Sequence, residues 1–314
     1  MPNGQNSDEN RIFKNWSFGT VNIRSGKEKD EGATIYALTK QISKLGLTFC
    51  CLQEVKYRNK GNMEITLNDG IKYQFIWCGM KMRREAGVGL LIKIDPKVII
   101  KDAEIMDPRM IAINIKAYGF NMRVVNVYSP TDVSSDNMKD SFYKLLQKAC
   151  KKSEKHEKLI ILGDLNAKTS LALKNCCYDG SNILVDDDCN DNGERMKQFC
   201  IRNNLCMSST YFDYPPENRY TWYSCDGRTK RVTDYVLVEK YVQEYVTQCK
   251  AEPDINFDSD HRIKITFLDT PMTRRARWKV GKHPTKKSIN VKSLEDEKVK
   301  DRFINNAENE LAKN

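Results

Sequence analysis

The sequence predicts an α/β fold in which mixed or antiparallel β-sheets face each other and helices cover their outer faces. Three features support this expectation. Apolar runs of strand length recur along the chain, segments with a helical spacing of apolar residues lie between some of them, and other strands follow one another through short turns. Because hairpin-linked strands are antiparallel, a purely parallel sheet is excluded.

The first half of the pattern alternates strands with one helix. Residues 16–23 (WSFGTVNI) predict a strand, and residues 47–55 (LTFCCLQEV) form the continuous apolar run that is typical of a strand covered on both faces. Between them, residues 31–46 predict a helix, because one face carries Ile35, Leu38, Ile42 and Leu45. Further strands are predicted at residues 87–94, 110–117 and 122–129.

The second half adds two helices and a hairpin. Amphipathic helices are predicted at residues 136–152 and 194–203, and strands at residues 158–164, 242–249 and 262–268. Residues 219–238 predict two strands joined by an Asp-Gly turn. No segment repeats at a fixed period, and the last strand is expected to end near Leu268, where Asp-Thr-Pro-Met follows.

The composition excludes several classes of protein. The 314 residues are 40% hydrophobic and 30% charged, which is typical of a folded globular chain. No apolar run approaches the roughly 20 residues of a membrane-spanning helix, and no signal peptide begins the sequence, so we expect a protein of the nucleus or cytoplasm. The eleven cysteines are odd in number and scattered, without Cys-x-x-Cys, so we interpret them as reduced thiols rather than disulfides or a zinc site.

Positive charge is concentrated near the end of the sequence. The net charge is +10, of which residues 271–314 supply +6 and residues 1–270 supply +4. Eight basic residues and no acidic one lie between positions 274 and 292, a stretch that attracts phosphate backbones or nuclear import factors, or is a solvated linker. We expect a disordered polar arm at residues 1–14, a folded domain at residues 15–270 and a basic, linker-like tail at residues 271–314.

Several predicted strands end in a carboxylate, an amide, a phenol or a histidine. Any one of these residues could be a cap or turn residue, but their recurrence favours a shared functional edge. The residues are Asn22, Glu54, Tyr128, Asp164 with Asn166, Asp234, and Asp260 with His261.

The chemistry of these groups suits a site for phosphate and a hard cation. The Glu54 carboxylate follows a dry strand, and such an oxygen ligand suits Mg²⁺. Asp164 and Asn166 share one face of an extended segment, so a group able to deprotonate water lies beside an amide able to contact phosphate. The simpler alternative for Glu54 is a solvated glutamate, and the simpler alternative for Asp164 and Asn166 is an Asx-turn.

Of the three histidines, His156 and His283 lie in basic segments and are expected to be exposed. His261 differs because it follows Asp260 and precedes a strand. Acidic neighbours raise the pKa of an imidazole, so His261 can stay protonated near neutral pH and hold a phosphoryl oxygen. Asp234 is a candidate for the acid that orients it, and a hydrogen-bonded interface histidine is the alternative.

Taken in order, VNIRS, LQEV, VYSPT, LGDLN, YTW, TDYVLV and SDHR resemble the motif set of the endonuclease/exonuclease/phosphatase superfamily. The resemblance covers residues 16–268 and rests on order and spacing, since each motif alone is weak. Within the superfamily, the sequence is most similar to endonuclease domains of non-LTR retrotransposons of the RTE-like group and to craniofacial development protein 2-like sequences. The tail resembles the connector to a reverse transcriptase, and the Ala-Asp-Asp signature of that polymerase is absent from this sequence.

This resemblance implies a four-layer α/β sandwich and Mg²⁺-dependent hydrolysis of a phosphodiester, with Mn²⁺ as the alternative ion. Glu54 would bind the metal, with Asn22 and Asp260 in support. The motifs also imply that Asp164 would orient or deprotonate the attacking water, and that Asn166 and Tyr128 would contact the phosphate. His261 would stabilise the charge on the phosphoryl group, and Asp234 would orient its ring.

Two positions depart from the motifs. Arg24 stands where apurinic nucleases commonly carry Asp, which removes one potential metal ligand. Trp222 resembles an aromatic residue of the abasic pocket, but Arg231 replaces a second aromatic, so specificity for abasic sites is not expected. The segment that resembles the DNA-approaching hairpin of retroelement relatives carries Arg228, Lys230 and Arg231. These residues either contact DNA phosphates or are simply solvated, and the sequence is compatible with both interpretations.

The sequence thus predicts a monomeric endonuclease that nicks DNA and leaves a 3′-hydroxyl, as in target-primed retrotransposition, with a polymerase domain in a full-length element. Two alternatives stay open. One is a domesticated remnant that binds nucleic acid without activity, for which Arg24 is the best support. The other is a phosphatase or phosphodiesterase of the same fold, which the modest charge of residues 1–270 does not exclude.

Overall fold

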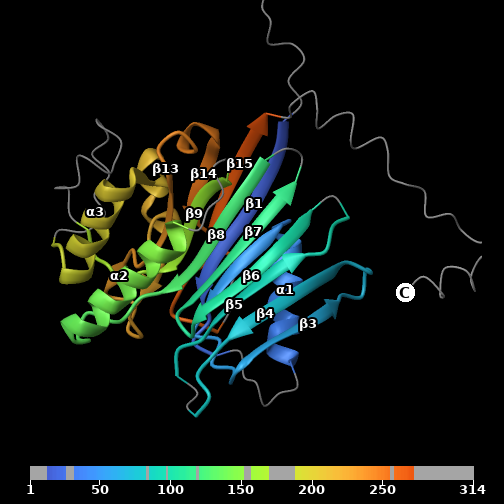
Figure 1. Ribbon diagram of the computed structural model, residues 1–314, viewed down its shortest axis with the longest axis horizontal. Helices are drawn as coiled ribbons and strands as arrows, with labels where there is room; N and C mark the ends of the chain where they lie inside the picture. Colours follow the sequence, from blue (N-terminus) through green and yellow to red (C-terminus); the bar gives the residue numbers. More distant parts are fainter. Residues whose placement is uncertain are drawn as a thin grey trace, which may run out of the picture. The chain divides into compact units, whose positions relative to one another are not determined.

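Two β-sheets form the centre of the protein (Figure 1). The first contains β1 (Phe13–Asn22), β2 (Phe49–Gln53), β3 (Lys60–Thr66), β4 (Lys72–Cys78), β5 (Val88–Lys93), β14 (Val246–Ala251) and β15 (Lys264–Pro271). The second contains β6 (Ile99–Asp107), β7 (Met110–Ala117), β8 (Phe120–Tyr128), β9 (Glu157–Asp164), β10 (Leu205–Met207) and β13 (Asp234–Glu239). The strand orders are β14-β15-β1-β2-β5-β4-β3 and β10-β13-β9-β8-β7-β6.

The computed structural model describes residues 13–25, 32–82, 85–96, 98–117, 120–151, 157–169, 188–254 and 258–271. Most of the predicted polar arm, all but the first residue of the predicted basic tail, and both His156 and His283 lie outside these ranges. None of the helices in these ranges is long and apolar enough to cross a membrane.

Each sheet contains one parallel pair of strands, and each pair is joined by a helix. α1 (Ala33–Lys44) connects β1 to its parallel neighbour β2, and α2 (Asp136–Lys151) connects β8 to its parallel neighbour β9. Parallel strands require such a crossover, whereas the other pairs are antiparallel. The sheets are therefore mixed, as the sequence predicts.

The core between the sheets is apolar. The stacked rings of Phe18 and Phe49, from β1 and β2, have centroids 4.9 Å apart. They belong to one buried cluster with Val124 of β8 and Val236 of β13. Burying each such side chain contributes roughly 1.5–3 kcal/mol to folding, so this cluster holds the sheets face to face.

Helices cover the outer faces of both sheets (Figure 1). Ile35 and Ile42 of α1 pack with Leu52 of β2 on the first sheet. Leu146 of α2 and Phe199 of α3 (Asp191–Asn203) pack on the second sheet. The result is the four-layer sandwich implied by the motifs. Because β2 is covered by α1 and by the second sheet, all five of its residues are buried, which explains the continuous apolar run.

A buried amide network ties the two sheets together near one edge. Gln53 Nε2 donates to Asn126 Oδ1 at 2.7 Å and to Thr20 Oγ1 at 3.0 Å. Asn126 Nδ2 then donates to the carbonyl oxygens of Leu52 and Gly89, at 3.1 and 2.6 Å. Because buried amides pay for lost hydration through specific hydrogen bonds, this network fixes the register of the sheets at that edge.

Four strands are not predicted from the sequence: β3, β4, β6 and β10. β3 lies at one edge of the first sheet, and β6 and the three-residue β10 lie at the two edges of the second. In β3, exposed or half-exposed side chains alternate along most of the strand, so no apolar run marks it. β4 is an inner strand whose Tyr73 and Phe75 are buried, so its sequence does contain an alternating apolar pattern.

Strand boundaries also differ from the prediction. β15 continues past Leu268 to Pro271, because its backbone pairs with β1 as far as Phe13, and β1 therefore begins inside the predicted polar arm. The predicted hairpin forms as β11 (Trp222–Tyr223) and β12 (Lys230–Arg231), but its second strand does not run directly into β13. The break lies at residues 232–233.

Candidate active site

The predicted site residues stand at the ends of the two parallel strand pairs. Asn22 ends β1 and Glu54 follows β2, while Tyr128 ends β8 and Asp164 ends β9. Backbone pairing aligns Asp164 with Tyr128 on one side and with Asp234 of β13 on the other. Since the carboxyl ends of both parallel pairs meet at one edge of the sandwich, residues far apart in sequence become neighbours.

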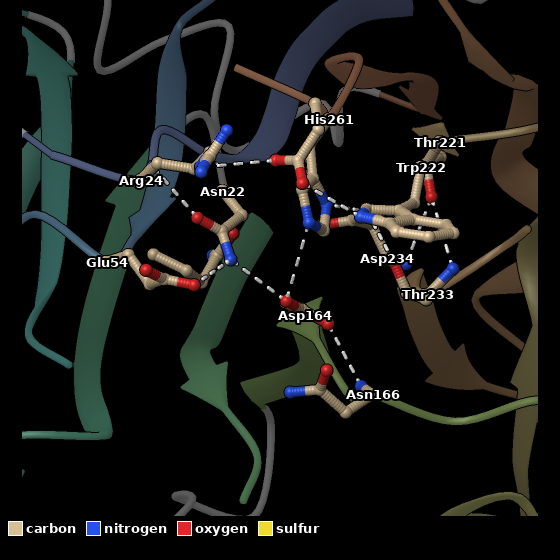
Figure 2. A network of polar contacts seen from close by, with 12 residues as sticks. Asn22, Arg24, Glu54, Asp164, Asn166, Thr221, Trp222, Thr233, Asp234 and His261 are labelled. Carbon is tan, nitrogen blue, oxygen red and sulfur yellow. Dashed lines mark hydrogen bonds and ion pairs between the residues drawn. The ribbon is translucent and has the colours of Figure 1, made fainter. Parts of the chain in front are cut away.

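Asn22 links the two sheets at this edge (Figure 2). Its Nδ2 atom donates to Glu54 Oε1 at 2.9 Å and to Asp164 Oδ2 at 3.0 Å. Its Oδ1 atom accepts from the backbone N–H of Arg24 at 3.0 Å, and its carbonyl oxygen accepts from Ser259 Oγ at 2.7 Å. Asn22 is 1% exposed. The amide therefore holds the Glu54 and Asp164 carboxylates beside each other.

Glu54 is held as an ionised carboxylate. Burial raises its pKa, but hydrogen bonds from Asn22, Lys56 and Tyr128 outweigh that effect and leave the pKa below its ordinary value. Tyr128 Oη donates to Glu54 Oε1 at 3.0 Å, and Lys56 Nζ lies 3.1 Å from Oε2. Burial, together with the nearby Glu54 and Asp164 charges, raises the pKa of Tyr128, so its phenol stays protonated and donates.

Asp164 is a buried carboxyl group that titrates near neutral pH. Burial and the nearby charge of Asp234 raise its pKa to about 7, against the opposing effects of His261 and of hydrogen bonds from Asn22 and Asn166. One of those bonds runs from the Asn166 backbone N–H to Asp164 Oδ1 at 2.9 Å. A carboxyl group with this pKa can accept a proton at physiological pH.

His261 lies between two carboxylates. Its Nδ1 atom is 2.9 Å from Asp234 Oδ2, and its Nε2 atom is 4.0 Å from Asp164 Oδ2. Burial lowers the pKa of His261, but the charges of Asp234, Asp164 and Asp260 and the Asp234 hydrogen bond raise it to about 9. The imidazole is therefore protonated at neutral pH and presents a positive charge.

Two threonines contact the Asp234 side chain and the backbone around it. Thr233 Oγ1 donates to Asp234 Oδ2 at 3.2 Å, and Thr221 Oγ1 accepts from the backbone N–H groups of Thr233 and Asp234, both at 3.2 Å (Figure 2). Asp234 is fully buried. This support fixes the carboxylate that orients His261.

Asp260 lies in a neighbouring set of contacts. The Trp222 indole Nε1 donates to Asp260 Oδ2 at 3.0 Å, and Arg24 Nε lies 3.7 Å from Asp260 Oδ1. Asn22 and Glu54, by contrast, bond to each other and to Asp164. The three predicted metal residues are therefore brought to one region, but they divide between two adjoining networks.

Asn166 is fixed in an unusual backbone conformation. Its φ of 47° lies in the left-handed region. Its Nδ2 donates to the Ser129 carbonyl oxygen at 3.0 Å, and its own carbonyl accepts from the side chains of Asn190 and Asn192, at 3.1 and 3.2 Å. Because an amide nitrogen carries two hydrogens, the second hydrogen of Nδ2 is left by the described residues for a ligand.

The basic residues of the predicted DNA-contacting hairpin lie outside this network. Arg228 is 88% exposed, with its Nε atom 3.8 Å from Asp226 Oδ2. Lys230 Nζ lies 6.0 Å from the centroid of the Tyr223 ring, and Arg231 Nη1 lies 3.9 Å from Asp188 Oδ1. The hairpin thus carries positive charge outside this network, while its Trp222 donates to Asp260 in the adjoining network.

The donor groups fit a hard divalent cation. Within the described ranges, the ligand atoms of Asp164, Asp234 and His261 all lie within 4.8 Å of one another. A protonated imidazole cannot ligate a metal, however, so this group fits an ion poorly while His261 is charged. Asp260 Oδ1 is buried and accepts no hydrogen bond from the described residues, and Glu54 is ionised. Carboxylate oxygens of this kind are the ligands that Mg²⁺ prefers.

Sequence reasoning missed several supporting residues. Ser259 Oγ bonds the Asn22 carbonyl and accepts from the His261 N–H at 3.1 Å, and its place in the Ser-Asp-His triplet was a usable signal. Arg109 lies over the Tyr128 ring, with its guanidinium carbon 4.8 Å from the ring centroid. It also donates to the carbonyl oxygens of Tyr128 and Ser129, at 3.4 and 3.3 Å. No motif marked Arg109.

Comparisons with known proteins bear on the family and the fold of the chain. The chain is 26% identical over 250 residues to craniofacial development protein 2 of Bos taurus, covering 80% of this chain and 40% of that protein. The chain therefore spans less than half the length of this curated relative. These matches confirm the resemblance that the sequence motifs indicated.

Solved structures show the same fold. An AP endonuclease from Leishmania major superposes with a TM-score of 0.57 at 15% identity, covering 82% of this chain and 89% of that one. The endonuclease domain of TRAS1, a telomere-specific non-LTR retrotransposon, superposes with a TM-score of 0.52 at 12% identity, covering 81% and 98%. Residues 19–261 match the family described as Endonuclease/Exonuclease/phosphatase. The chain belongs to the Endonuclease/Exonuclease/phosphatase family.

Proposed function

We propose that this chain is a divalent-metal-dependent endonuclease that nicks DNA and leaves a 3′-hydroxyl. One observation carries the proposal. An ionised carboxylate, Glu54, is joined through Asn22 to Asp164, whose pKa is about 7, and Asp164 faces the imidazolium of His261 at 4.0 Å. Phosphodiester hydrolysis requires a base for water and positive charge for the phosphoryl group, and this cluster contains both.

In this proposal Asp164 removes a proton from the attacking water. Its pKa of about 7 leaves half of the molecules ionised at that pH, and the carboxylate remains basic enough to accept the proton. The hydrogen bonds from Asn22 and Asn166 hold both of its oxygens in place. The water is therefore activated at a fixed position.

His261 and Asn166 hold the phosphate. The Nε2–H of the imidazolium donates to a phosphoryl oxygen, while Asp234 accepts from Nδ1 and fixes the ring. The second amide hydrogen of Asn166 donates to another oxygen. Tyr128 gives its hydroxyl hydrogen to Glu54, so its predicted contact with phosphate requires that bond to be exchanged.

A divalent cation would be held by Glu54, with Asn22 and Asp260 in support, as the motifs imply. When bound, it supplies positive charge that neutralises the phosphate and stabilises the departing oxygen. Such a site is supported by the ionised Glu54 and by Asp260 Oδ1, which accepts no hydrogen bond from the described residues although Arg24 Nε lies 3.7 Å away. Mg²⁺ is the proposed ion, with Mn²⁺ as the alternative.

Support for DNA as the substrate comes from the relatives. The superposed proteins include an AP endonuclease and a retrotransposon endonuclease domain. The exposed Arg228 and Lys230 are suited to phosphate backbones. In a full-length retroelement, the 3′-hydroxyl would prime reverse transcription. For this chain the proposal covers only the nick that produces this 3′-hydroxyl.

The test is a plasmid-nicking assay. Supercoiled plasmid incubated with the purified chain and Mg²⁺ is expected to become relaxed, and the nick should support extension by a DNA polymerase, which requires a 3′-hydroxyl. Asp164→Asn should abolish nicking. Glu64→Gln is the matched control, because Glu64 pairs with Lys72 on the surface of β3 and β4. Unchanged supercoiled plasmid at every enzyme and metal concentration would contradict the proposal.

The family description also includes phosphatases, so soluble phosphomonoesters and inositol phosphates should be assayed in parallel. Faster turnover of these compounds than of plasmid would replace the endonuclease proposal with a phosphatase of the same fold. Salt-sensitive DNA binding without hydrolysis of any substrate would instead favour the inactive nucleic-acid-binding remnant.

A further inference from the structure

A cleft opens beside the catalytic cluster, on the side of Asp260 and His261. Its volume is about 590 Å³, and its lining includes Arg24, residues 223–225 and residues 258–262. This volume lies within the range of about 300–1,000 Å³ typical of sites for small molecules. Because Asp260 and His261 belong both to the cleft and to the cluster, a ligand in the cleft would adjoin the reacting phosphate.

Arg262 and Tyr223 form a flat, fixed surface in this cleft. The guanidinium carbon of Arg262 lies 4.2 Å from the centroid of the Tyr223 ring, and Arg262 Nη1 donates to the Glu217 carbonyl oxygen at 2.9 Å. The Tyr223 N–H donates to the Asp260 carbonyl oxygen at 2.9 Å, and the Arg262 N–H to the Thr221 carbonyl oxygen at 2.7 Å. Stacked aromatic and guanidinium planes of this kind are surfaces on which nucleobases stack.

Arg24 brings a second guanidinium to the cleft. Its side chain is 56% exposed, and its Nε atom lies 3.7 Å from Asp260 Oδ1, so one edge is anchored while the rest faces solvent. Its backbone has a φ of 53°, in the left-handed region, and its N–H donates to Asn22 Oδ1 at 3.0 Å. In Figure 2 Arg24 lies beside Asn22. A guanidinium held in this way is suited to a phosphate oxygen.

We propose that this cleft binds the nucleotide next to the scissile phosphate, with its base stacked on Arg262 and Tyr223 and its outer phosphate held by Arg24. The inference rests on the proposed endonuclease function and deepens it. A strand whose scissile phosphate lies at His261 has its neighbouring nucleotide within reach of the cleft. Arg24 then has a role in substrate binding.

The proposal has a consequence for sequence preference. Stacking is possible for every base but is stronger for larger ring systems, so it produces modest preferences rather than strict recognition. Nick sites should therefore favour a purine at one position adjacent to the cleaved bond. This preference should weaken when the Arg262 plane is lost, while cleavage itself continues.

The first test measures binding without cleavage. Deoxyadenosine 3′,5′-bisphosphate, which contains one base and two phosphates, is titrated by calorimetry in EDTA against the full chain and its Arg262→Gln, Arg262→Lys and Arg24→Gln variants. Loss of a base-stacking surface costs roughly 5- to 150-fold in affinity. Arg262→Lys keeps the charge but loses the planar group, so it should also weaken binding. Arg24→Gln should weaken binding of the bisphosphate more than binding of the unphosphorylated nucleoside.

Arg202→Gln is the matched control, because Arg202 is an exposed arginine on α3. Thermal unfolding checks that each variant is folded. Equal affinities in the parent and all three cleft variants, or no binding of the bisphosphate at millimolar concentration, would overturn the assignment of the cleft. The same loss in Arg202→Gln would overturn it as well, since the effect would then be one of net charge.

The second test separates this inference from the proposed function. Nick positions on plasmid are sequenced for the parent and for Arg262→Lys. If the parent nicks plasmid and neither bisphosphate affinity nor nick preference changes in the variant, the endonuclease proposal stands and the cleft assignment fails. If the parent binds the bisphosphate, the cleft variants bind it more weakly and no plasmid is nicked, the assignment of the cleft as a nucleotide site is supported and the endonuclease proposal fails.

Discussion

The Nδ1 atom of His261 lies 2.9 Å from Oδ2 of Asp234, although 27 residues separate the two in sequence. Asp234 begins β13 in the second sheet, whereas His261 shortly precedes β15 in the first. The pair therefore spans both sheets at the edge where the parallel strands end. Its charge state decides whether the site presents an imidazolium to its substrate.

Replacing Asp234 by Asn should lower the pKa of His261 and slow nicking by about 10²–10⁴-fold, the usual contribution of a positioned acid or base. The amide keeps a similar shape but removes the largest of the neighbouring charges that together raise the imidazole pKa against the effect of burial. Single-turnover nicking rates at pH 7.5 check the rate, and NMR titration of the histidine ring checks the pKa. A rate within threefold of the parent would contradict the role of this pair.

The rate of nicking should depend on pH on both sides of an optimum. Asp164, with a pKa of about 7, must be ionised to accept a proton, so the rate should rise as pH increases through that value. His261, with a pKa of about 9, must be protonated, so the rate should fall above it. Single-turnover rates between pH 5.5 and 10 measure both limbs. A rate that is independent of pH across this range would exclude both assignments.

Stability should respond to pH through Asp164. Its pKa in the folded state is about 7, above the ordinary value of 3.8, so its contribution is present below the unfolded pKa and is lost as pH rises through 7. Asp164→Asn removes this titration. The Tm of the variant minus that of the parent should therefore increase between pH 4 and pH 8.

The control for that series is Asp213→Asn, because the Asp213 carboxylate is 82% exposed and pairs with Arg219 at the surface. Its Tm difference should stay nearly constant over the same range, and thermal melts followed by circular dichroism measure both. A Tm difference for Asp164→Asn that falls with pH would mean that burial does not raise the pKa of this carboxyl group.

Glu54→Gln should weaken Mg²⁺ binding without disturbing the fold. Glutamine keeps an oxygen that accepts from Asn22 and Tyr128, but it lacks the negative charge of the carboxylate. Since losing a supporting group alone typically costs 10–100-fold in metal affinity, a larger loss is expected here. Isothermal calorimetry in the absence of DNA provides the measurement, and Glu64→Gln should bind Mg²⁺ as the parent does. Equal affinities for all three proteins would place the cation elsewhere.

The hairpin should contribute electrostatic affinity that depends on salt. Arg228→Gln and Lys230→Gln each remove one exposed positive charge. If each contacts one phosphate, the slope of log affinity against log salt should fall by about one for each variant. Fluorescence anisotropy with a short duplex, in EDTA to prevent cleavage, measures the slope. An unchanged slope in both variants would show that Arg228 and Lys230 do not contact DNA phosphates.

The sequence predicts an element best where a regular pattern of apolar side chains marks it. The helical face of Ile35, Leu38 and Ile42 predicted α1, and the apolar run of β2 predicted a strand covered on both faces. The edge strand β3 is not predicted because its outer side chains are solvated, so no apolar pattern marks it. The end of β15 was placed too early because pairing with β1 outweighs the local tendency of Asp-Thr-Pro to end a strand.

For the site, the motifs named Asn22, Glu54, Asp164, Asp234 and His261, and the structure brings these five together. The network that supports them was not evident. Thr221, Ser259 and Arg109 act through backbone groups or ring faces, and such contacts depend on distances that no short motif records. No motif indicates that the predicted metal residues divide between two networks. That division arises because Asp260 contacts Trp222 and Arg24.

The sequence by itself determined the identity of the chemical groups and the alternation of strands and helices, because both follow from residue types and their local spacing. Only the tertiary structure decided how those groups behave. Strand pairing places Asp164 between Tyr128 and Asp234, and burial in that position raises the pKa of Asp164. The strength of an electrostatic interaction depends on separation and solvent exposure, and both arise only when the two sheets close upon each other.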